Sequence, residues 1–379
     1  MRNRLAELRH RPVWRPQGRL TDLYAVATLA LVPLSAGIHQ LLPPRFTYDS
    51  DTLQRIASGE YTPLEDTSYL YVGRLYGWLG MAERPWAAAL LGLVLAAVAL
   101  YPALVRARGT ATAPVYALVG LYVLLASVYL GAYSKDVWVL PVVIVVLLAG
   151  RGWRGELAIV VTTAAYASSL RSYWFLILAV YLGLRVLTAR ALTRRRLVLG
   201  AAGVLVGVTV LAPLLLGQDI QAVRESVNLD RVLSTDAATA ISSLDLGLGL
   251  LGSVVENVVT FLELLVPVPL LAQGSPVYAA YFLGIVLIWG MWAWSTMVGP
   301  GRLLDGRPAA EADLRSVRTA LFAFAVVLTQ GFFEPDYGSY LRHLTPVLPL
   351  VIAATVGRAG SRFMTPLPTS SAPSPQAGA

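Results

Sequence analysis

Long runs of apolar residues alternate with short clusters of charged residues along most of the chain. Such runs predict transmembrane helices, because a helix needs about 20 residues to cross the hydrocarbon core of a bilayer. We therefore expect an all-α, polytopic integral membrane protein with about ten spans, some of them completed by flanking residues. The predicted spans are Leu23–Leu42, Trp86–Val105, Val115–Tyr133, Val137–Ala149, Leu157–Leu170, Tyr173–Leu187, Leu197–Leu216, Val277–Val298, Thr319–Phe333 and Thr345–Val356.

One further apolar run, Leu246–Gln273, is ambiguous because it also carries Glu256, Glu263 and two prolines. With a cytoplasmic N-terminus and ten crossings, the arginine clusters fall in cytoplasmic loops, as the positive-inside rule requires. If Leu246–Gln273 also crossed, the last two clusters would move outside. We therefore expect this run to be an outer-face element, either re-entrant or lying in the membrane interface.

The predicted spans divide the chain into three parts. Residues 1–22 form a basic cytoplasmic segment, which lacks the cleavage motif of a signal peptide. Residues 23–360 form the membrane domain, with extracytoplasmic loops at 43–85, 217–276 and 334–344. Residues 361–379, rich in Pro, Ser and Ala, are expected to be a disordered cytoplasmic tail. The expected location is the cytoplasmic membrane of the cell, with both termini inside.

Composition supports this class and excludes several chemistries. Hydrophobic residues make up 56% of the chain and charged residues 14%, against roughly 25% charged in soluble domains. The absence of cysteine excludes disulfides, thiolate nucleophiles and cysteine–metal sites, and the three histidines show no zinc spacing. The predicted outer loops collect most acids and a few cations, whereas the inner loops are short and basic. We therefore expect any chemistry on the outer face.

The first outer loop contains Asp49 and Asp51 at the start of a predicted short helix. Asp49 suits an N-cap position, and Asp51 would lie in the first turn, where the helix dipole favours a carboxylate. A carboxylate here is also able to deprotonate an attacking sugar hydroxyl. The next segment, Asp66–Gly80, is rich in tyrosine and tryptophan. It is either an aromatic belt at the membrane boundary or a platform on which sugars stack.

Two predicted outer turns carry cations at the membrane boundary. Lys135 and Asp136 lie in one turn, and Arg171 occupies the equivalent turn of the next hairpin. Both are either ordinary polar turns or a site that stabilises a pyrophosphate leaving group. The outer segment 217–245 carries Arg224 and Arg231, which belong either to a solvated helix face or to a cap over a membrane-embedded groove.

The loop before the last span packs several reactive side chains into a short stretch, namely Glu334, Asp336, Tyr340, Arg342 and His343. Ionisable clusters at a membrane edge indicate function by default, although a structural salt-bridge cluster is the alternative. Arg342 suits a phosphate group, and His343 is able to donate to an oxyanion or shuttle a proton.

Two resemblances follow from these segments. The acidic first loop with Gly59-Glu60-Tyr61, the SYLYVGRLYGWLG helix and the closing RHLTPVLPL resemble polyprenyl-phosphate-dependent glycosyltransferases of the GT-C kind. In that group an acid of the first outer loop is the base, a position that Asp49 or Asp51 matches. The SKD turn, the outer cap with paired arginines and EPDYGSYLRH look more like Wzy-type or EpsG-like polysaccharide polymerases, whose outer arginines hold the pyrophosphate carrier.

The resemblance implies transfer of polyprenyl-(di)phosphate-linked glycans to a glycan acceptor outside the cell, most simply as polymerisation of surface or exopolysaccharide repeat units. The alternatives are a single-sugar GT-C transferase, a transporter or flippase of lipid-linked glycans, and a non-catalytic scaffold. The expected partners are a polyprenyl-linked sugar or oligosaccharide, a glycan acceptor and the lipid bilayer, with no nucleic acid. No cofactor is required, although Asp49 and Asp51 are able to hold one divalent cation.

The candidate site residues take two roles. The catalytic candidates are Asp49, Asp51 and His343, and the substrate-binding candidates are Lys135, Asp136, Arg171, Arg224, Arg231, Glu334, Asp336, Tyr340 and Arg342.

Overall fold

The structure is a computed structural model of the chain. It describes residues 47–62, 67–107, 113–150, 152–217, 246–299, 302–306 and 314–356, together with 26–27, 222, 239–241 and 244. The predicted first span Leu23–Leu42, apart from residues 26–27, lies outside the described residues. So do the basic segment 1–22 and the tail 361–379.

The described residues form helices and no strand, which confirms the all-α class. The helices in order are α3 (Tyr48–Ala57), α4 (Thr67–Trp78), α5 (Pro85–Ala107), α6 (Ala113–Tyr129), η2 (Asp136–Val139), α7 (Leu140–Leu148), α8 (Trp153–Ser169), α9 (Trp174–Thr188), α10 (Arg194–Leu216), α12 (Leu250–Leu265), α13 (Val268–Ala272), α14 (Pro276–Ala293), η4 (Trp294–Val298), α15 (Leu314–Phe333), α16 (Tyr337–Leu344), η6 (Thr345–Val347) and α17 (Leu348–Val356).

Four helical stretches in the described part of the chain are long and apolar enough to cross a membrane. They are Pro85–Val105, Arg194–Leu214, Pro276–Val298 and Leu314–Phe333. Shorter apolar helices occupy Ala113–Tyr129, Asp136–Leu148 and Trp174–Thr188. Each of these seven stretches overlaps a predicted span, so the membrane character of the chain is supported. The full count of ten crossings stays a prediction.

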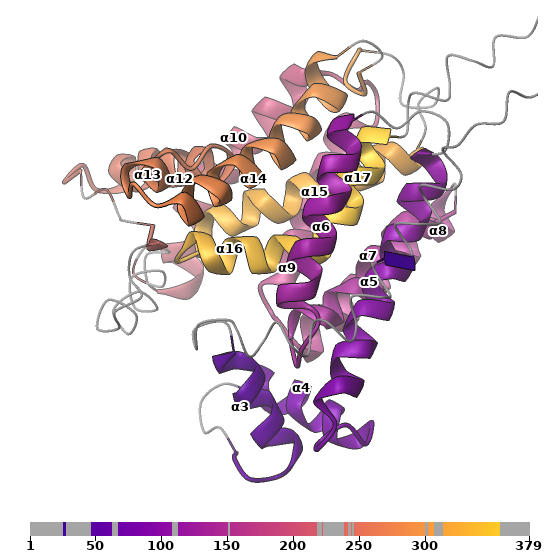
Figure 1. The fold of residues 1–379 in the computed structure, drawn as a ribbon. Helices are drawn as coiled ribbons and strands as arrows, with labels where there is room; N and C mark the ends of the chain where they lie inside the picture. Colours follow the sequence, from indigo (N-terminus) through magenta and orange to yellow (C-terminus); the bar gives the residue numbers. More distant parts are fainter. Residues whose placement is uncertain are drawn as a thin grey trace, which may run out of the picture.

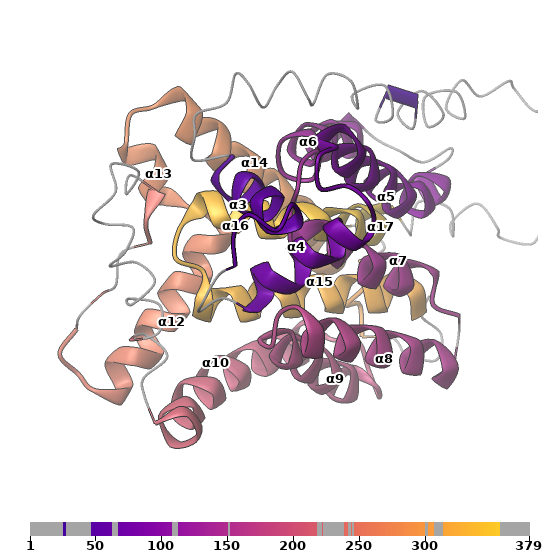
Figure 2. The same ribbon diagram turned by 90° about the horizontal axis from the view of Figure 1, so that it is seen from below.

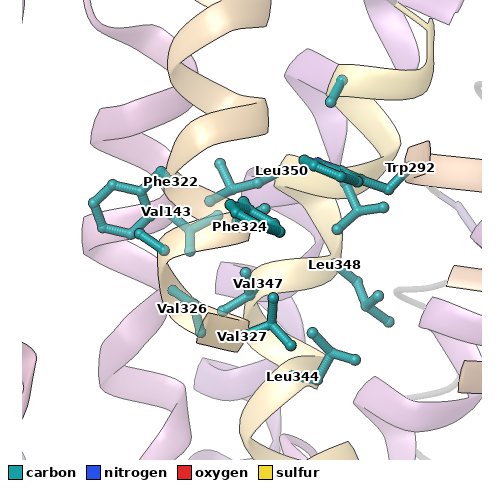
Figure 3. Close-up of a cluster of buried hydrophobic side chains, with 14 of the residues drawn as sticks. Val143, Trp292, Phe322, Phe324, Val326, Val327, Leu344, Val347, Leu348 and Leu350 are labelled. Atoms are coloured by element: carbon teal, nitrogen blue, oxygen red, sulfur yellow. The ribbon is translucent and has the colours of Figure 1, made fainter. Parts of the chain in front are cut away.

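α15 forms the centre of the bundle. It packs against α7, α9, α12 and α17, and 94% of its most apolar stretch is buried. Phe324 stacks on Trp292 of α14 with ring centroids 5.1 Å apart, and α17 contributes Leu348 and Leu350 to the same cluster (Figure 3). Tight packing of large apolar side chains on all sides explains why this helix is buried throughout.

The apolar surface of α14 is exposed, in contrast to that of α15. Only 22% of the apolar stretch Pro276–Val298 is buried, and Val277, Leu283 and Trp294 are each more than half exposed. Soluble monomers rarely expose apolar patches of this extent, because water contact with that area is unfavourable. Lipid is the solvent that such a helix suits.

α3 and α4 form a helical hairpin at one end of the bundle, which both views show (Figures 1 and 2). Leu53 of α3 and Val72 and Tyr76 of α4 build a small apolar cluster separate from the main core. The two helices approach closely because Gly73 and Gly77 carry no side chain. A Cβ atom on Gly73 would lie 2.5 Å from Ile56 Cγ2, and one on Gly77 would lie 2.8 Å from the Ala57 carbonyl oxygen.

Predicted outer segments meet one another, and so do predicted inner segments. On the predicted outer side, Ala240 bridges Asp336, and the Ile241 N–H donates to the Pro335 carbonyl at 2.9 Å. On the predicted inner side, the Gly306 N–H donates to the Leu192 carbonyl at 2.9 Å. The structure contains no membrane, so the side on which each of these pairs lies stays a prediction.

The ambiguous run Leu246–Gln273 forms α12 and the short α13, with a break at Val266 and Pro267. α12 packs against α10 and α15, and the Asn257 side chain of α12 donates to Thr209 of α10 at 2.8 Å. Its buried polar face, which includes Glu256, explains why the run combines apolar and acidic residues.

Candidate functional site

The candidate site lies where the α3–α4 hairpin meets the bundle, and its central residue is Asp136. This residue begins the short helix η2, directly after the turn that follows α6, and only 1% of it is exposed. Its carboxylate faces two arginines and a histidine. The Asp136 Oδ1 atom lies 2.8 Å from Arg171 Nη2, and the Oδ2 atom lies 3.3 Å from Arg342 Nε. His343 Nε2 lies 4.0 Å from Oδ1.

Burial by itself would raise the pKa of Asp136, because it disfavours the carboxylate. Arg171, His343 and Arg342 outweigh burial and lower the pKa of Asp136 to about 2. The same attraction acts on the partner, since Asp136 raises the pKa of the Arg171 guanidinium although burial opposes this. Asp136 is therefore ionised at neutral pH. The alternative of an ordinary exposed polar turn is wrong for Asp136.

Asp49 extends the ion-pair chain to the hairpin. The helix α3 begins at Tyr48, its N-cap residue is Thr47, and no side chain caps it. The prediction that Asp49 caps the helix is therefore wrong. Its carboxylate instead accepts from the Arg342 guanidinium and from the Tyr69 hydroxyl of α4. Burial would raise the pKa of Asp49, but Arg342 and then Tyr69 outweigh it and hold the pKa below its ordinary value.

Lys135 joins the hairpin to the same turn. Its Nζ atom lies 3.3 Å from the centroid of the Tyr69 ring and 3.4 Å from Ser68 Oγ. A cation over a tyrosine face is attracted by the negative face of the ring. Tyr69 therefore orders both Lys135, through its ring, and Asp49, through its hydroxyl.

The helix α16 supplies Arg342 and His343 from its last turn. Asp336 caps its first turn, because the carboxylate accepts from the Ser339 N–H at 2.8 Å. Cations in a last turn are favoured by the helix dipole, and Pro346 ends the regular helix by withholding an N–H. His343 Nδ1 lies 2.9 Å from Glu334 Oε2. This contact fixes the orientation of the imidazole ring.

The site combines nearly balanced charge with unused hydrogen-bonding capacity. Three acids (Asp49, Asp136, Glu334) face three permanent cations (Lys135, Arg171, Arg342), together with His343. Within the described residues, Glu334 Oε1 is buried and has no hydrogen-bond partner, whereas Asp136 Oδ1 and Arg342 Nε are held by the ion pairs given above. A buried polar atom is costly when unpaired, so this oxygen favours a hydrogen-bond donor at this position.

Other predicted site residues lie elsewhere. Asp51 is exposed on α3, away from the ion-pair chain. The Tyr340 hydroxyl is fully buried and accepts from the Trp289 indole N–H at 2.6 Å, which is a packing role. Arg224 and Arg231 lie outside the described residues. The role of Tyr69 was missed, because its sequence context indicates only an aromatic-rich segment.

A second charged cluster lies between α8, α9 and α15. Glu156 of α8 accepts from Arg185 of α9 at 2.6 Å and from Arg318 of α15 at 3.0 Å. Arg318 is 1% exposed and also donates to the Gly150 carbonyl and, at 2.9 Å, to the Gly152 carbonyl, which follow α7. This cluster joins the ends of helices on the predicted inner side. Nothing in the sequence pattern indicated it.

In the described part of the chain, no three His, Asp or Glu side chains are arranged to hold a metal ion. Asp49 and Asp51, the predicted holders of a divalent cation, are not brought together, since Asp49 binds Arg342 and Asp51 is exposed. Comparison with known proteins adds no assignment: no protein family, no curated protein and no solved structure matches this chain.

Proposed function

We propose that the protein is a membrane glycosyltransferase that acts on the extracytoplasmic face with polyprenyl-diphosphate-linked glycans, as a polymerase of polysaccharide repeat units. One observation carries the proposal. Four separate segments bring three acids, three cations and a histidine together between a polar hairpin and an apolar bundle. A lipid-linked substrate needs such a place, with its tail in lipid and its phosphates among cations.

The cations suit the leaving group. Arg342 and Arg171 carry planar guanidinium groups that match phosphate oxygens, and Lys135 adds a point charge. In the resting site these cations are held by Asp49, Asp136 and the Tyr69 ring. A diphosphate competes with Asp49 for Arg342. Binding of the substrate would therefore release the Asp49 carboxylate from its strongest partner.

Release of Asp49 gives it the properties of a general base. Its pKa is held low by Arg342 and Tyr69 in the resting site, so loss of Arg342 raises that pKa toward the value that catalysis needs. In the proposed step, the acceptor hydroxyl oxygen forms a bond to C1 of the donor sugar. The C1–O bond to the diphosphate breaks, and its electron pair stays on the phosphate oxygen. The hydroxyl proton passes to Asp49.

His343 assists at the leaving group. Glu334 holds Nδ1 of the imidazole ring at 2.9 Å, while Nε2 faces Asp136 at 4.0 Å. A carboxylate on one ring nitrogen fixes the tautomer, so that the other nitrogen carries the opposite role. With the Nδ1 proton held by Glu334, Nε2 of the neutral ring is the acceptor, so His343 donates to the departing diphosphate only as the imidazolium. Asp136 keeps Arg171 and Arg342 oriented toward the diphosphate.

A chain-extension assay tests the proposal. Purified protein in bilayers would receive polyprenyl-linked oligosaccharides extracted from its host, and product length would be followed on a gel. We expect a ladder with wild type and with Asp51→Asn, which is the matched control on the same helix. Asp49→Asn should slow extension by roughly 10²–10⁴-fold, the typical contribution of a general base. Arg342→Ala should slow it by at least roughly 10²-fold.

Other results would redirect the assignment. A single added sugar would replace polymerisation by a GT-C type of transfer. Equal loss in Asp49→Asn and Asp51→Asn would remove the special role of Asp49. No extension by folded wild-type protein, with a substrate that an active extract extends, would refute the enzyme.

The second charged cluster favours one rival function, a transporter of lipid-linked glycans. Ion pairs lie at both ends of the bundle, Asp136–Arg171 and Glu156–Arg318, and in a transporter they would act as two gates that open in alternation. A flipping assay with fluorescent polyprenyl-linked sugar in sealed vesicles separates the two functions. If the protein is a transporter, wild type should move the fluorescent lipid across the vesicle membrane, so that the lipid loses its protection, and Arg318→Met should not. The enzyme predicts no flipping by either.

The membrane orientation can be tested because the chain has no cysteine. Single cysteines at Ser58 and Ala189, which are exposed at the predicted outer and inner ends, report the side directly. An impermeant maleimide applied to intact cells should label Ser58→Cys only. Labelling of Ala189→Cys alone would reverse the orientation and place the site inside.

A further inference from the structure

A hollow of about 370 Å³ opens on the α3–α4 hairpin, apart from the charged site. The last turn of α3 and the chain after it, up to Thr62, form one wall, and Leu70, Arg74 and Gly77 of α4 form the other. We propose that this hollow binds a neutral sugar unit of the acceptor glycan. This inference rests on the proposed function, because the hollow would hold an inner sugar of the glycan that the same enzyme extends.

The side chains around the hollow suit a sugar. Tyr61 is 42% exposed, and the Arg55 guanidinium lies 5.3 Å from the centroid of its ring, so the ring is held in place. Aromatic faces pack against the apolar C–H faces of sugar rings as they do against other apolar groups. Arg74 is exposed and makes no hydrogen bond or ion pair within the described residues. Its N–H groups are available to sugar hydroxyls.

The local field favours a neutral ligand over an anion. The residues Ile56, Ala57 and Ser58 at the end of α3 border the hollow. The C-terminal end of a helix carries a partial negative charge, which disfavours phosphate or carboxylate. Among the residues that the structure describes, Arg74 is the cation that lines the hollow, and Arg55 lies against the Tyr61 ring beside it. Three permanent cations surround Asp136.

The position of the hollow fits an acceptor that reaches Asp49. Asp49 lies in the first turn of α3, and Ser58 follows its last residue. With a rise of 1.5 Å per residue, the two ends are about 13 Å apart along the helix. A glycan of a few sugar units spans that distance, so its end can lie at Asp49 while an inner unit occupies the hollow. Close packing at Gly73 and Gly77 keeps the two walls in fixed positions.

A binding experiment tests the proposal independently of transfer. The full chain in nanodiscs would be titrated with short neutral oligosaccharides, cut from the envelope polysaccharide of the host, by isothermal calorimetry. We expect Arg74→Ala to raise the Kd about tenfold and Tyr61→Ala to raise it about fivefold. The matched controls are Arg84→Ala and Tyr101→Ala, which alter exposed residues outside the hollow and should bind like wild type. All four positions are exposed, so the variants should fold.

Each outcome decides one of the two proposals. If wild type binds the oligosaccharides through Tyr61 and Arg74 but transfers nothing, the proposed function fails and the sugar site stands. If wild type extends glycans while both variants keep its Kd and KM, the sugar site fails and the function stands. If sn-glycerol 3-phosphate displaces the oligosaccharide in wild type but not in Arg74→Ala, the hollow is an anion site and the proposal is overturned.

Discussion

The variant Asp136→Asn removes the charge on which the site is built while keeping the shape of the side chain. Asp136 is 1% exposed and faces Arg171, Arg342 and His343. Its pKa is about 2, against 3.8 for an unperturbed carboxyl. At about 1.4 kcal/mol per pKa unit, the folded environment favours the carboxylate by about 2 kcal/mol. The substitution removes stabilisation of this order.

The larger contribution comes from the partner that the variant leaves behind. The Arg171 side chain is 8% exposed and would keep its charge without its carboxylate. Breaking a buried ion pair on one side typically costs about 3–5 kcal/mol, because the remaining charge is uncompensated. We therefore expect a loss of about 2–5 kcal/mol. At about 2 °C per kcal/mol in a chain of this size, Tm should fall by about 4–10 °C.

Tryptophan fluorescence during heating, at a fixed scan rate in one detergent, measures this change. Asp51→Asn is the matched control, because Asp51 is exposed and its variant should melt like wild type. Adding Arg171→Met to Asp136→Asn should recover part of the loss, since the uncompensated charge is then removed as well. If Asp136→Asn melts within about 1 °C of wild type, the buried ion-pair chain is not what holds this region together.

Three further predictions follow from single contacts. Gly73→Ala should separate α3 from α4, because the new Cβ atom would lie 2.5 Å from Ile56 Cγ2. Protease nicking of the hairpin should then rise while the bundle stays intact, and unchanged nicking would contradict this packing. Tyr340→Phe should lower the free energy of unfolding by about 1–3 kcal/mol, because it leaves the Trp289 N–H unpaired. Glycan extension per folded molecule should be unchanged, and a selective loss of extension would make Tyr340 a site residue. The pKa of Asp136 in the folded protein lies below 3.8, so the stability that this carboxylate contributes is present above pH 3.8 and is lost as the pH falls toward 2. Over this window Tm should drop more in wild type than in Asp136→Asn. Equal drops would refute this prediction.

The sequence predicts which segments form helices, because apolar runs of membrane length have few other solutions. It also predicts that the turns carrying Asp136, Arg171 and Arg342 lie on one side, since alternate crossings return the chain to the same face. Asp49 and Arg342 are nevertheless 293 positions apart. No local pattern indicates that these two residues pair.

Contacts that depend on close packing could not be predicted. Tyr69 reaches Asp49 only because Gly73 and Gly77 let α4 approach α3 closely. The sequence predicts Arg318 to be one basic residue among several in a cytoplasmic loop, yet in the structure it is buried against Glu156. Its burial follows from the central position of α15, which a hydropathy pattern does not distinguish from a lipid-facing helix such as α14.

The central claim is that the site between the hairpin and the bundle breaks a sugar–diphosphate bond and forms a glycosidic bond in one step. The direct measurement is release of polyprenyl diphosphate alongside new linkages, with purified wild type and Asp49→Asn and a lipid-linked repeat unit as substrate. We predict equal molar amounts of both products with wild type and loss of both with Asp49→Asn. Release without a new linkage, or equal yields from the two proteins, would contradict the account.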